Sequence, residues 1–362
     1  MTTVQNAARS QISYAHDRLR PVRIWLYAMA ALVLTMVVVG GITRLTESGL
    51  SITSWKPISG IIPPLNDAQW QAEFDAYKQI PQYTVDNSWM GVNDFKVIFF
   101  WEFVHRLIGR LLGLAFIVPF LVFLAQKRFS PQLAWPLFGL FLLGGFQGLL
   151  GWWMVSSGLS ELTSVSQYRL AAHLTAALML FLALIYVPRS LEPGHVPGLE
   201  PTRNLGWAGV LLLLIIIQIA AGAFVAGLDA GMGYNTWPLM DGSLVPDGLG
   251  VMQPVWKNLF ENAMTVQFIH RTIAYVIVAY VGVMVWQQRA FGGFAGVHGW
   301  LPRLGLLVLL QVILGIGTLV MHVPTSLAVG HQAMAFMLAG VTIAYVADMR
   351  RAGRLAANSA VI

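Results

Sequence analysis

Four histidines lie inside apolar stretches of the sequence, at His105, His173, His270 and His331. An imidazole surrounded by hydrocarbon loses the hydration of its nitrogens, so ionisable residues in such places usually mark a functional site. Two imidazoles that face each other from neighbouring helices can ligate one haem iron from both sides. The order along the chain predicts two such pairs, His105 with His173 and His270 with His331. Each histidine taken alone could be a hydrogen-bonded core residue, but the pairing and the duplication favour ligation.

Other ligand chemistries fit the composition less well. The sequence has no cysteine, which excludes disulfides, thiolate haem ligands and cysteine-based metal sites. Zinc or copper could use the same histidines, but these ions usually take a third or fourth protein ligand, and the sequence shows no such cluster. The remaining histidines are expected in solvent-exposed termini and loops: His16, His195, His298 and His322.

An arginine follows the first histidine of each pair, Arg106 after His105 and Arg271 after His270. Beside a haem, these guanidinium groups could bind the propionates through paired hydrogen bonds. They could equally extend to the membrane interface, as long basic side chains often do. The sequence leaves both interpretations open.

The two pairs differ at the position three residues before their first histidine. Glu102 precedes His105, whereas Gln267 precedes His270. Residues three apart share a helix face, so Glu102 is expected to point toward the ligand near His105. A carboxyl group there could relay protons or stabilise positive charge, whereas an amide only forms hydrogen bonds. We therefore predict a catalytic first half and a supporting second half. The alternative is a carboxylate that is paired with Arg106 or lies in the interface.

The composition predicts an all-α integral membrane protein. Hydrophobic residues make up 57% of the 362 residues and charged residues 10%, with a mean hydropathy of +0.66. Apolar windows of about twenty residues are long enough to span a bilayer. Eight such windows are found, near 22–43, 98–125, 132–155, 170–188, 205–226, 266–287, 304–321 and 329–347.

The basic residues are distributed as a membrane topology requires. The formal charge is +6, but arginine and lysine gather at both ends of the chain and in alternate loops, which indicates topology and not nucleic-acid binding. Both termini are therefore expected to be cytoplasmic, in the inner membrane of a bacterium and not of a mitochondrion. The long loops 44–97 and 227–265 are expected to face the periplasm and to cover sites near that surface.

The two halves of the chain read as copies of one four-helix unit. Four pairs of segments correspond in order: 41–49 with 223–231, 103–108 with 268–273, Gln147 with Gln311, and 172–176 with 330–334. An even number of spans in each copy makes the copies parallel, as two tandem four-helix bundles. The expected organisation is an N-terminal segment 1–21, a first half 22–190, a linker 191–204, a second half 205–348 and a tail 349–362.

These motifs resemble the haem A synthase family over nearly the whole chain. The resemblance is carried by GGITRLTESGLS at 40–51, EFVHR at 102–106, AHL at 172–174, IHR at 269–271 and GHQ at 330–332. Some members carry a cysteine pair in the first outer loop, and this chain is similar to the subgroup that lacks it.

The resemblance implies oxidation of the C8 methyl group of haem O to a formyl group, which gives haem A for terminal oxidases. It implies a haem b cofactor on His270 and His331, with Arg271 beside it. The haem O substrate is implied between His105 and His173, with Arg106 beside it and with Glu102 needed for activity. Successive hydroxylations would give an alcohol and then a hydrated aldehyde, which loses water.

The histidine pairs alone fit a second class of protein equally well. A dihaem b-type electron-transfer protein without oxygenase activity would need both pairs but not Glu102. A haem exporter or chaperone is a weaker alternative, since it would return haem O unchanged. The sequence identifies no electron donor, and it is compatible with contacts to haem O synthase or oxidase assembly factors and with an oligomer.

Overall fold

The computed structural model describes residues 3–56, 59–160, 162–193, 201–291 and 300–359. Across these ranges the chain is helical, and its β-structure is limited to an isolated bridge between Met240 and Ser243. The long helices are α1 (Thr3–Leu45), α4 (Val92–Ala125), α5 (Pro131–Ser156), α6 (Gln167–Ser190), α7 (Pro201–Gly227), α9 (Ala263–Phe291), α10 (Trp300–Val320) and α11 (Thr325–Ser359). The short ones are α2 (Asp67–Tyr77), α3 (Pro81–Val85) and α8 (Asn258–Glu261).

All eight predicted spans are helices in the structure. In the described part of the chain, eight helices are long and apolar enough to cross a membrane. Several extend beyond the predicted bounds: α1 begins at Thr3, α4 begins at Val92 and α11 continues to Ser359. Hydropathy detects only the apolar part of a helix, whereas the helix itself continues through flanking polar residues until its backbone hydrogen bonds end.

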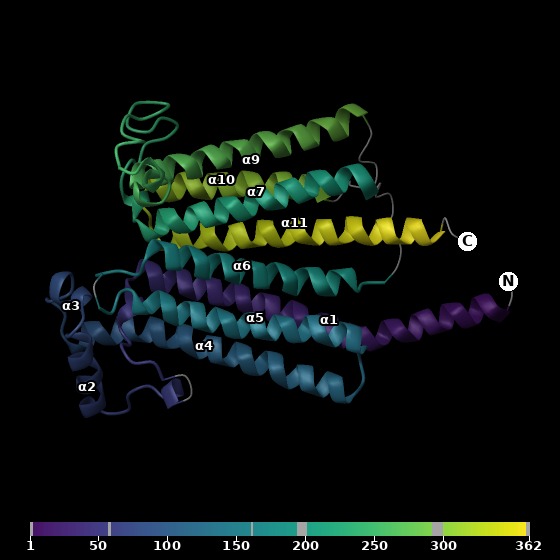
Figure 1. Cartoon of the computed structure of the whole chain (residues 1–362), viewed down its shortest axis with the longest axis horizontal. Coiled ribbons are helices and arrows are strands. Elements are labelled where there is room, and N and C mark those ends of the chain that lie inside the picture. Colours follow the sequence, from purple (N-terminus) through teal and green to yellow (C-terminus); the bar gives the residue numbers. More distant parts are fainter. Residues whose placement is uncertain (1–2, 57–58, 161, 194–200, 292–299, 360–362) are drawn as a thin grey trace.

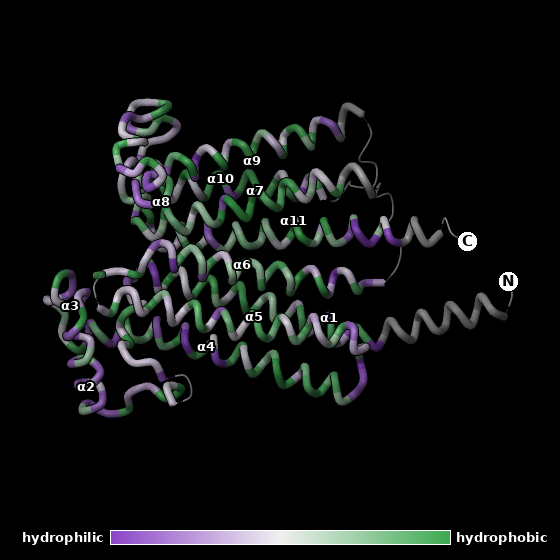
Figure 2. The backbone as a smooth tube through the Cα atoms, in the orientation of Figure 1, coloured by the Kyte–Doolittle hydropathy of each residue, from purple (hydrophilic) through white to green (hydrophobic). Residues whose placement is uncertain are grey.

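The long helices lie side by side along the longest axis of the molecule (Figure 1). One group consists of α1, α4, α5 and α6 and the other of α7, α9, α10 and α11, and the groups pack together through α6 with α7, α6 with α11 and α1 with α11. Apolar residues dominate the middle of the helices, and polar residues gather toward their ends (Figure 2). We call the end that carries the segments 46–91 and 228–262 the loop end, and the opposite end the terminal end.

Hydrogen-bonded ion pairs join the two groups of helices at both ends. At the loop end, Arg44 Nη2 donates to both carboxylate oxygens of Asp229 at 2.9 Å. At the terminal end, Arg189 Nε and Nη2 on α6 each donate to one carboxylate oxygen of Asp348 on α11 at 2.8 Å. The ion pair between Arg189 and Asp348 is the stronger of the two, because it has two parallel hydrogen bonds and Asp348 is only 2% exposed.

The segment 46–91 has a small core of its own outside the bundle. Asn66 directly precedes its helix α2, and the Asn66 side chain accepts the Gln69 N–H and so caps the first turn. Phe74 and Tyr77 of α2 pack against Phe95 in the first turns of α4. The segment is thus attached to the first turns of α4, which precede His105 on the same helix.

Tyr77 is the polar centre of that small core. It is fully buried, its hydroxyl donates to Gln82 Oε1 at 3.0 Å, and it accepts from Asn87 Nδ2 at 2.8 Å. Gln82 Nε2 in turn donates to the Glu47 carbonyl at 3.1 Å, just after α1. Burial raises the pKa of Tyr77 to about 12, so the hydroxyl stays a neutral donor at physiological pH.

Tyr77→Phe is expected to lower the free energy of unfolding by about 1–3 kcal/mol, since Gln82 and Asn87 each lose a partner inside a dry core. Thermal denaturation in detergent, followed by tryptophan fluorescence, measures the effect. Tyr83→Phe is the matched control, because the Tyr83 hydroxyl makes only a 3.5 Å contact with the Ser88 carbonyl near the surface. Equal melting temperatures for the two variants would contradict the role given to Tyr77.

Candidate functional site: two histidine pairs

The four histidines lie on four different helices and form the pairs that the sequence predicts. His105 is on α4, His173 on α6, His270 on α9 and His331 on α11, all in the part of the bundle nearer the loop end. The rings of His270 and His331 have their centres 6.4 Å apart and are inclined at 72°. His105 and His173 lie within electrostatic interaction range of each other.

The spacing of the second pair suits a metal bound between the rings. A metal–imidazole bond is about 2.0 Å, and the nitrogen lies about 1.1 Å from the ring centre, so two imidazoles on opposite sides of one ion have centres about 6.2 Å apart. The observed 6.4 Å agrees with that value. Hydrogen bonding between the rings would need much closer approach. The donor set therefore fits a bis-imidazole haem iron.

Buried polar atoms beside the pairs also lack protein partners. Within the described residues, the Nδ1 atoms of His173 and His270 are buried and accept or donate no hydrogen bond. Buried ring nitrogens without partners are rare in folded proteins and need an explanation, such as a bound group that the protein alone does not supply. In the same ranges no cluster of three or more histidine, aspartate or glutamate side chains could hold a metal ion.

Three of the histidines are tied to a glutamine on an adjacent helix. Gln147 Nε2 donates to the His173 carbonyl at 2.8 Å, Gln218 Nε2 to that of His270 at 3.0 Å, and Gln311 Nε2 to that of His331 at 3.1 Å. The repeat identified Gln147 and Gln311 but not Gln218. These bonds fix the position of each histidine along the axis of the adjacent helix. They thereby set the depth of the imidazole in the bundle.

Glu102 is buried, with 2% of its surface exposed, and its carboxylate is fully engaged. Oε1 accepts from Nε and Nη2 of Arg106 at 3.0 and 2.6 Å, and Oε2 accepts from the Ser51 hydroxyl and the Ile52 N–H, both at 2.7 Å. This is the pairing with Arg106 that the sequence left open as the alternative for Glu102. The helix spacing of four residues brings the two side chains together.

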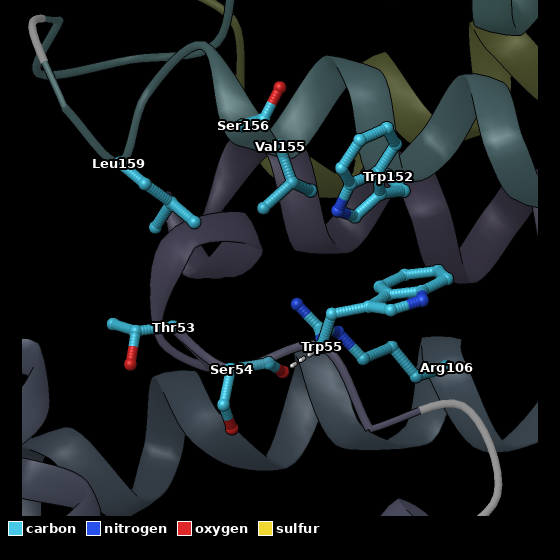
Figure 3. Close-up of a pocket in the computed structure, with 8 residues that line it drawn as sticks. All are labelled: Thr53, Ser54, Trp55, Arg106, Trp152, Val155, Ser156 and Leu159. Atoms are coloured by element: carbon cyan, nitrogen blue, oxygen red, sulfur yellow. Dashed lines mark hydrogen bonds between the residues drawn. The ribbon is translucent and has the colours of Figure 1, made fainter.

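Arg106 extends the network into the loop that follows α1. Its Nη1 donates to the Ser54 carbonyl at 3.0 Å (Figure 3). Its Nη2 donates to the Ile52 carbonyl at 2.8 Å. The guanidinium also lies over the Trp55 ring, 5.9 Å from its centre. Arg106 thus binds backbone carbonyls within the protein and does not simply extend to the solvent.

A small cavity of about 40 Å³ lies beside Arg106 (Figure 3). Trp55 of the loop and Trp152 of α5 line it, with ring centres 6.5 Å apart, together with Ser156. Its volume admits water-sized molecules and is far too small for a macrocycle. The cavity therefore lies between the loop and the end of α5, beside the arginine that follows His105.

The second half repeats this network with an amide in place of the acid. Gln267 Oε1 accepts from Arg271 Nη2 at 3.0 Å, and Gln267 Nε2 donates to the Ala230 and Gly233 carbonyls at 2.7 and 2.9 Å. Arg271 in turn donates to the Tyr234 and Thr236 carbonyls at 2.6 and 2.9 Å. Each half therefore fixes its outer segment through residues one turn from its first histidine, and only the first half carries a carboxylate there.

The histidines outside the pairs do not join either site where the structure describes them. His322 is exposed in the turn between α10 and α11, as expected. His195 and His298 lie outside the described residues, and the side chain of His16 does too.

Comparison with known proteins agrees with the resemblance read from the motifs. The sequence profile of the COX15-CtaA family, described as cytochrome oxidase assembly protein, matches residues 23–343. A protein of Azorhizobium caulinodans named "Heme A synthase" is 55% identical over 334 residues, which is 92% of this chain and 95% of that protein. Proteins with the same name from Allorhizobium ampelinum and Mesorhizobium japonicum are each 50% identical, over 90% of this chain and 90% and 89% of theirs. The chain therefore belongs to the COX15-CtaA family of cytochrome oxidase assembly proteins.

Proposed function

We propose that the chain is an oxidoreductase of the membrane that converts haem O into haem A, the activity named for its relatives. The observation that carries the proposal is the presence of two histidine pairs of which only the first is accompanied by a buried carboxylate. A protein that carried electrons alone would need both pairs but not the carboxylate of Glu102. One acidic and one neutral site suit a protein in which one haem is altered and the other is kept.

The second half, 205–348, is proposed to hold haem b between His270 and His331, whose ring separation fits one iron. When bound there, haem b supplies one-electron transfer to the first half. The residues of the chain hold the ligands: Gln218 and Gln311 fix the helices that carry them. Arg271 holds the overlying segment in place through bonds to its carbonyls. We further propose that a propionate of the haem binds the same guanidinium.

The first half, 22–190, is proposed to hold the substrate haem O between His105 and His173. Glu102 lies one turn from His105, and the segment 51–54 is fixed over it by Arg106. This segment excludes bulk water, which strengthens the effect of a nearby charge. In each hydroxylation dioxygen is the oxidant: one of its oxygen atoms enters the C–H bond of the C8 methyl, and the other leaves as water with protons and electrons from the donor. The carboxylate of Glu102 stabilises positive charge or accepts a proton as the methyl becomes an alcohol and then a hydrated aldehyde, which loses water to give the formyl group.

The arrangement of the helices supports a proposal for the side of the membrane on which the reaction takes place. The start of α1 and the end of α11 lie at the same end of the bundle, opposite the long loops (Figure 1). We propose that this end is cytoplasmic in a bacterial inner membrane, as the basic residues indicate, so that both sites lie toward the periplasmic side. Haem O synthase and oxidase assembly factors are the partners that such a reaction needs before and after it, and the electron donor is a separate protein or quinol.

Glu102→Gln is expected to retain haem binding but to lower turnover of haem O by at least about 100-fold, the range lost with a catalytic acid or base. Glutamine keeps the shape of the side chain, and Gln267 shows that an amide can serve the same arginine and loop. The measurement is extraction of haems from protein purified from cells that supply haem O, with chromatographic separation and mass detection. Wild type should yield haem b with haem A or its hydroxylated precursor, and the variant haem b with haem O.

Glu47→Gln is the matched control, since Glu47 is an exposed carboxylate in the same segment and should keep wild-type turnover. Full turnover by Glu102→Gln would remove the carboxylate from the chemistry. Haem b alone in wild type, with two exchange-inert haems per chain, would instead favour the dihaem electron-transfer protein.

A further inference from the structure

We infer that four glycines, each on the helix beside a histidine, set the position and orientation of the imidazoles that ligate haem. Gly40 on α1 faces His105, Gly151 on α5 faces His173, Gly222 on α7 faces His270 and Gly315 on α10 faces His331. The inference rests on the proposed function, because it concerns how the proposed ligands are held.

The distances show that these four positions have no room for a side chain. A Cβ atom at Gly40 would lie 3.0 Å from Nε2 of His105, and one at Gly315 would lie 2.8 Å from Cε1 of His331. At both Gly151 and Gly222 the distance to Cε1 of the facing histidine would be 3.1 Å. Carbon atoms in ordinary contact are about 3.5–4.0 Å apart, so even a methyl group would push each ring away.

The close approach is made by the imidazole and not by the opposing backbone. Small residues in membrane helices usually allow two backbones to approach, which would explain the glycines without reference to the histidines. Here the nearest atoms at all four positions belong to a histidine ring. Other glycines of the same helices differ: a Cβ at Gly148 or Gly305 would meet no atom within 4 Å, and a Cβ at Gly41 or Gly227 would approach a glutamine, Gln332 or Gln167. Among the glycines that the structure describes, a close histidine ring is therefore specific to these four positions.

Three of the four rings present the same edge to the glycine. At His173, His270 and His331 the nearest atom is Cε1 and the next is Nδ1, whereas at His105 the nearest is Nε2 and the next is Cδ2. A half-turn of the imidazole about its bond to Cβ exchanges these two edges, and the choice between them is set by the hydrogen-bond network and not by the ring shape. At all four positions the tip of the imidazole, Cε1 or Nε2, lies against the glycine.

Three of the glycines belong to a repeated Gln-x-x-x-Gly motif. Gln147 and Gly151 are one turn apart on α5, as are Gln218 and Gly222 on α7 and Gln311 and Gly315 on α10. The glutamine donates to the histidine carbonyl, and the glycine leaves space for the ring. One face of the adjacent helix therefore positions both the backbone and the imidazole of the histidine. Gln218 and Gln311 Nε2 also lie 3.2–3.3 Å from nitrogens of the His270 and His331 rings.

Such control of orientation has a direct consequence for ligation. A metal ligand must be held within about 0.5 Å and 10–20° of its working geometry, and residues that orient ligands typically change metal affinity 10–100-fold. A Cβ atom at Gly315 would lie 2.8 Å from Cε1 of His331, so the ring would have to shift to restore ordinary contact, by a distance comparable to that tolerance. The four glycines are thus positioning residues that act through the histidines.

The test compares Gly315→Ala with Gly317→Ala, two residues away on α10. A Cβ at Gly317 would be 3.8 Å from Leu327, an ordinary contact. Both variants are purified from cells that supply haem b, and two quantities are measured: bound haem per polypeptide, and the electron paramagnetic resonance g values of the low-spin ferric haem. Gly315→Ala should bind haem b about 10–100-fold more weakly or show shifted g values, and Gly317→Ala should match wild type.

Gly151→Ala keeps the test valid if Gly315→Ala fails to fold. Its effect should be confined to the first pair, so the haem of the second half serves as an internal reporter of folding, with Gly148→Ala as its control. Wild-type haem content and g values in the glycine variants would overturn the inference and leave the proposed function intact. A wild-type protein without any low-spin haem would instead overturn the proposed function itself.

Discussion

Alanine in place of His270 or His331 is expected to abolish the low-spin haem signal of the second half and to reduce conversion of haem O by more than about 100-fold. Loss of an orienting partner already costs 10–100-fold in metal affinity, and loss of the ligand itself costs more. At a ring separation of 6.4 Å both imidazoles can reach one iron, and among the described residues no cluster of three or more potential metal ligands could replace a lost one. Visible and paramagnetic resonance spectra of purified protein measure the first effect, and haem extraction measures the second.

The matched control is His322→Ala, which removes an exposed histidine between α10 and α11 and should leave spectra and turnover unchanged. His105→Ala separates the two sites, because it should retain the haem b spectrum while haem O remains unprocessed. A His331→Ala protein with an unaltered low-spin spectrum would show that the second pair does not ligate iron.

Arg189→Ala is expected to have the largest effect on stability, about 3 kcal/mol. Asp348 is 2% exposed, and loss of the paired bonds from Arg189 leaves a buried charge with Arg351 alone, 3.4 Å from Oδ1. Removing one partner of a buried pair costs about 3–5 kcal/mol, and the remaining arginine places this case at the lower limit. Thermal denaturation in detergent measures the loss, which should also weaken the contact between α6 and α11.

Two further variants show whether the buried charge is the cause. Arg350→Ala removes a neighbouring exposed arginine that contacts only the Tyr186 ring and hydroxyl, and should change the melting temperature little. Arg189→Ala combined with Asp348→Leu removes the unpaired carboxylate and should recover much of the stability. If the double variant were no more stable than Arg189→Ala, desolvation of Asp348 would not explain the loss.

Hydropathy and the histidine pattern predicted the helices and the pairing, because both depend on properties that repeat along the chain. The eight spans are recovered, and His270 and His331 come together as the repeat requires. The environment of Glu102 could not be predicted from spacing. Its spacing from His105 and Arg106 in the sequence allows contact with either residue. Hydrogen bonds from the loop residues Ser51 and Ile52 hold the carboxylate beside Arg106.

The Gln-x-x-x-Gly motif was missed for a related reason. Gln218 and Gly222 are unremarkable in an apolar helix, and their meaning depends on which helix lies beside α7. A pattern of one glutamine and one glycine, one turn apart, is visible in the sequence four times: at the three positions beside histidines, and at Gln288 and Gly292, of which Gly292 lies outside the described residues. Only the packing of α7 on α9 and of α10 on α11 connects it with histidines.

The first helix departs from that motif, and the departure leaves α4 less firmly held. Met36 occupies the place on α1 that glutamine has on the other three helices, four residues before Gly40. A thioether donates no hydrogen bond, so among the described residues α1 makes no such bond to the His105 carbonyl, whereas α6, α9 and α11 each accept one from a glutamine. If the two pairs hold a substrate and a cofactor as proposed, α4 is the helix that can shift along its neighbour during exchange of the substrate without breaking a glutamine bond.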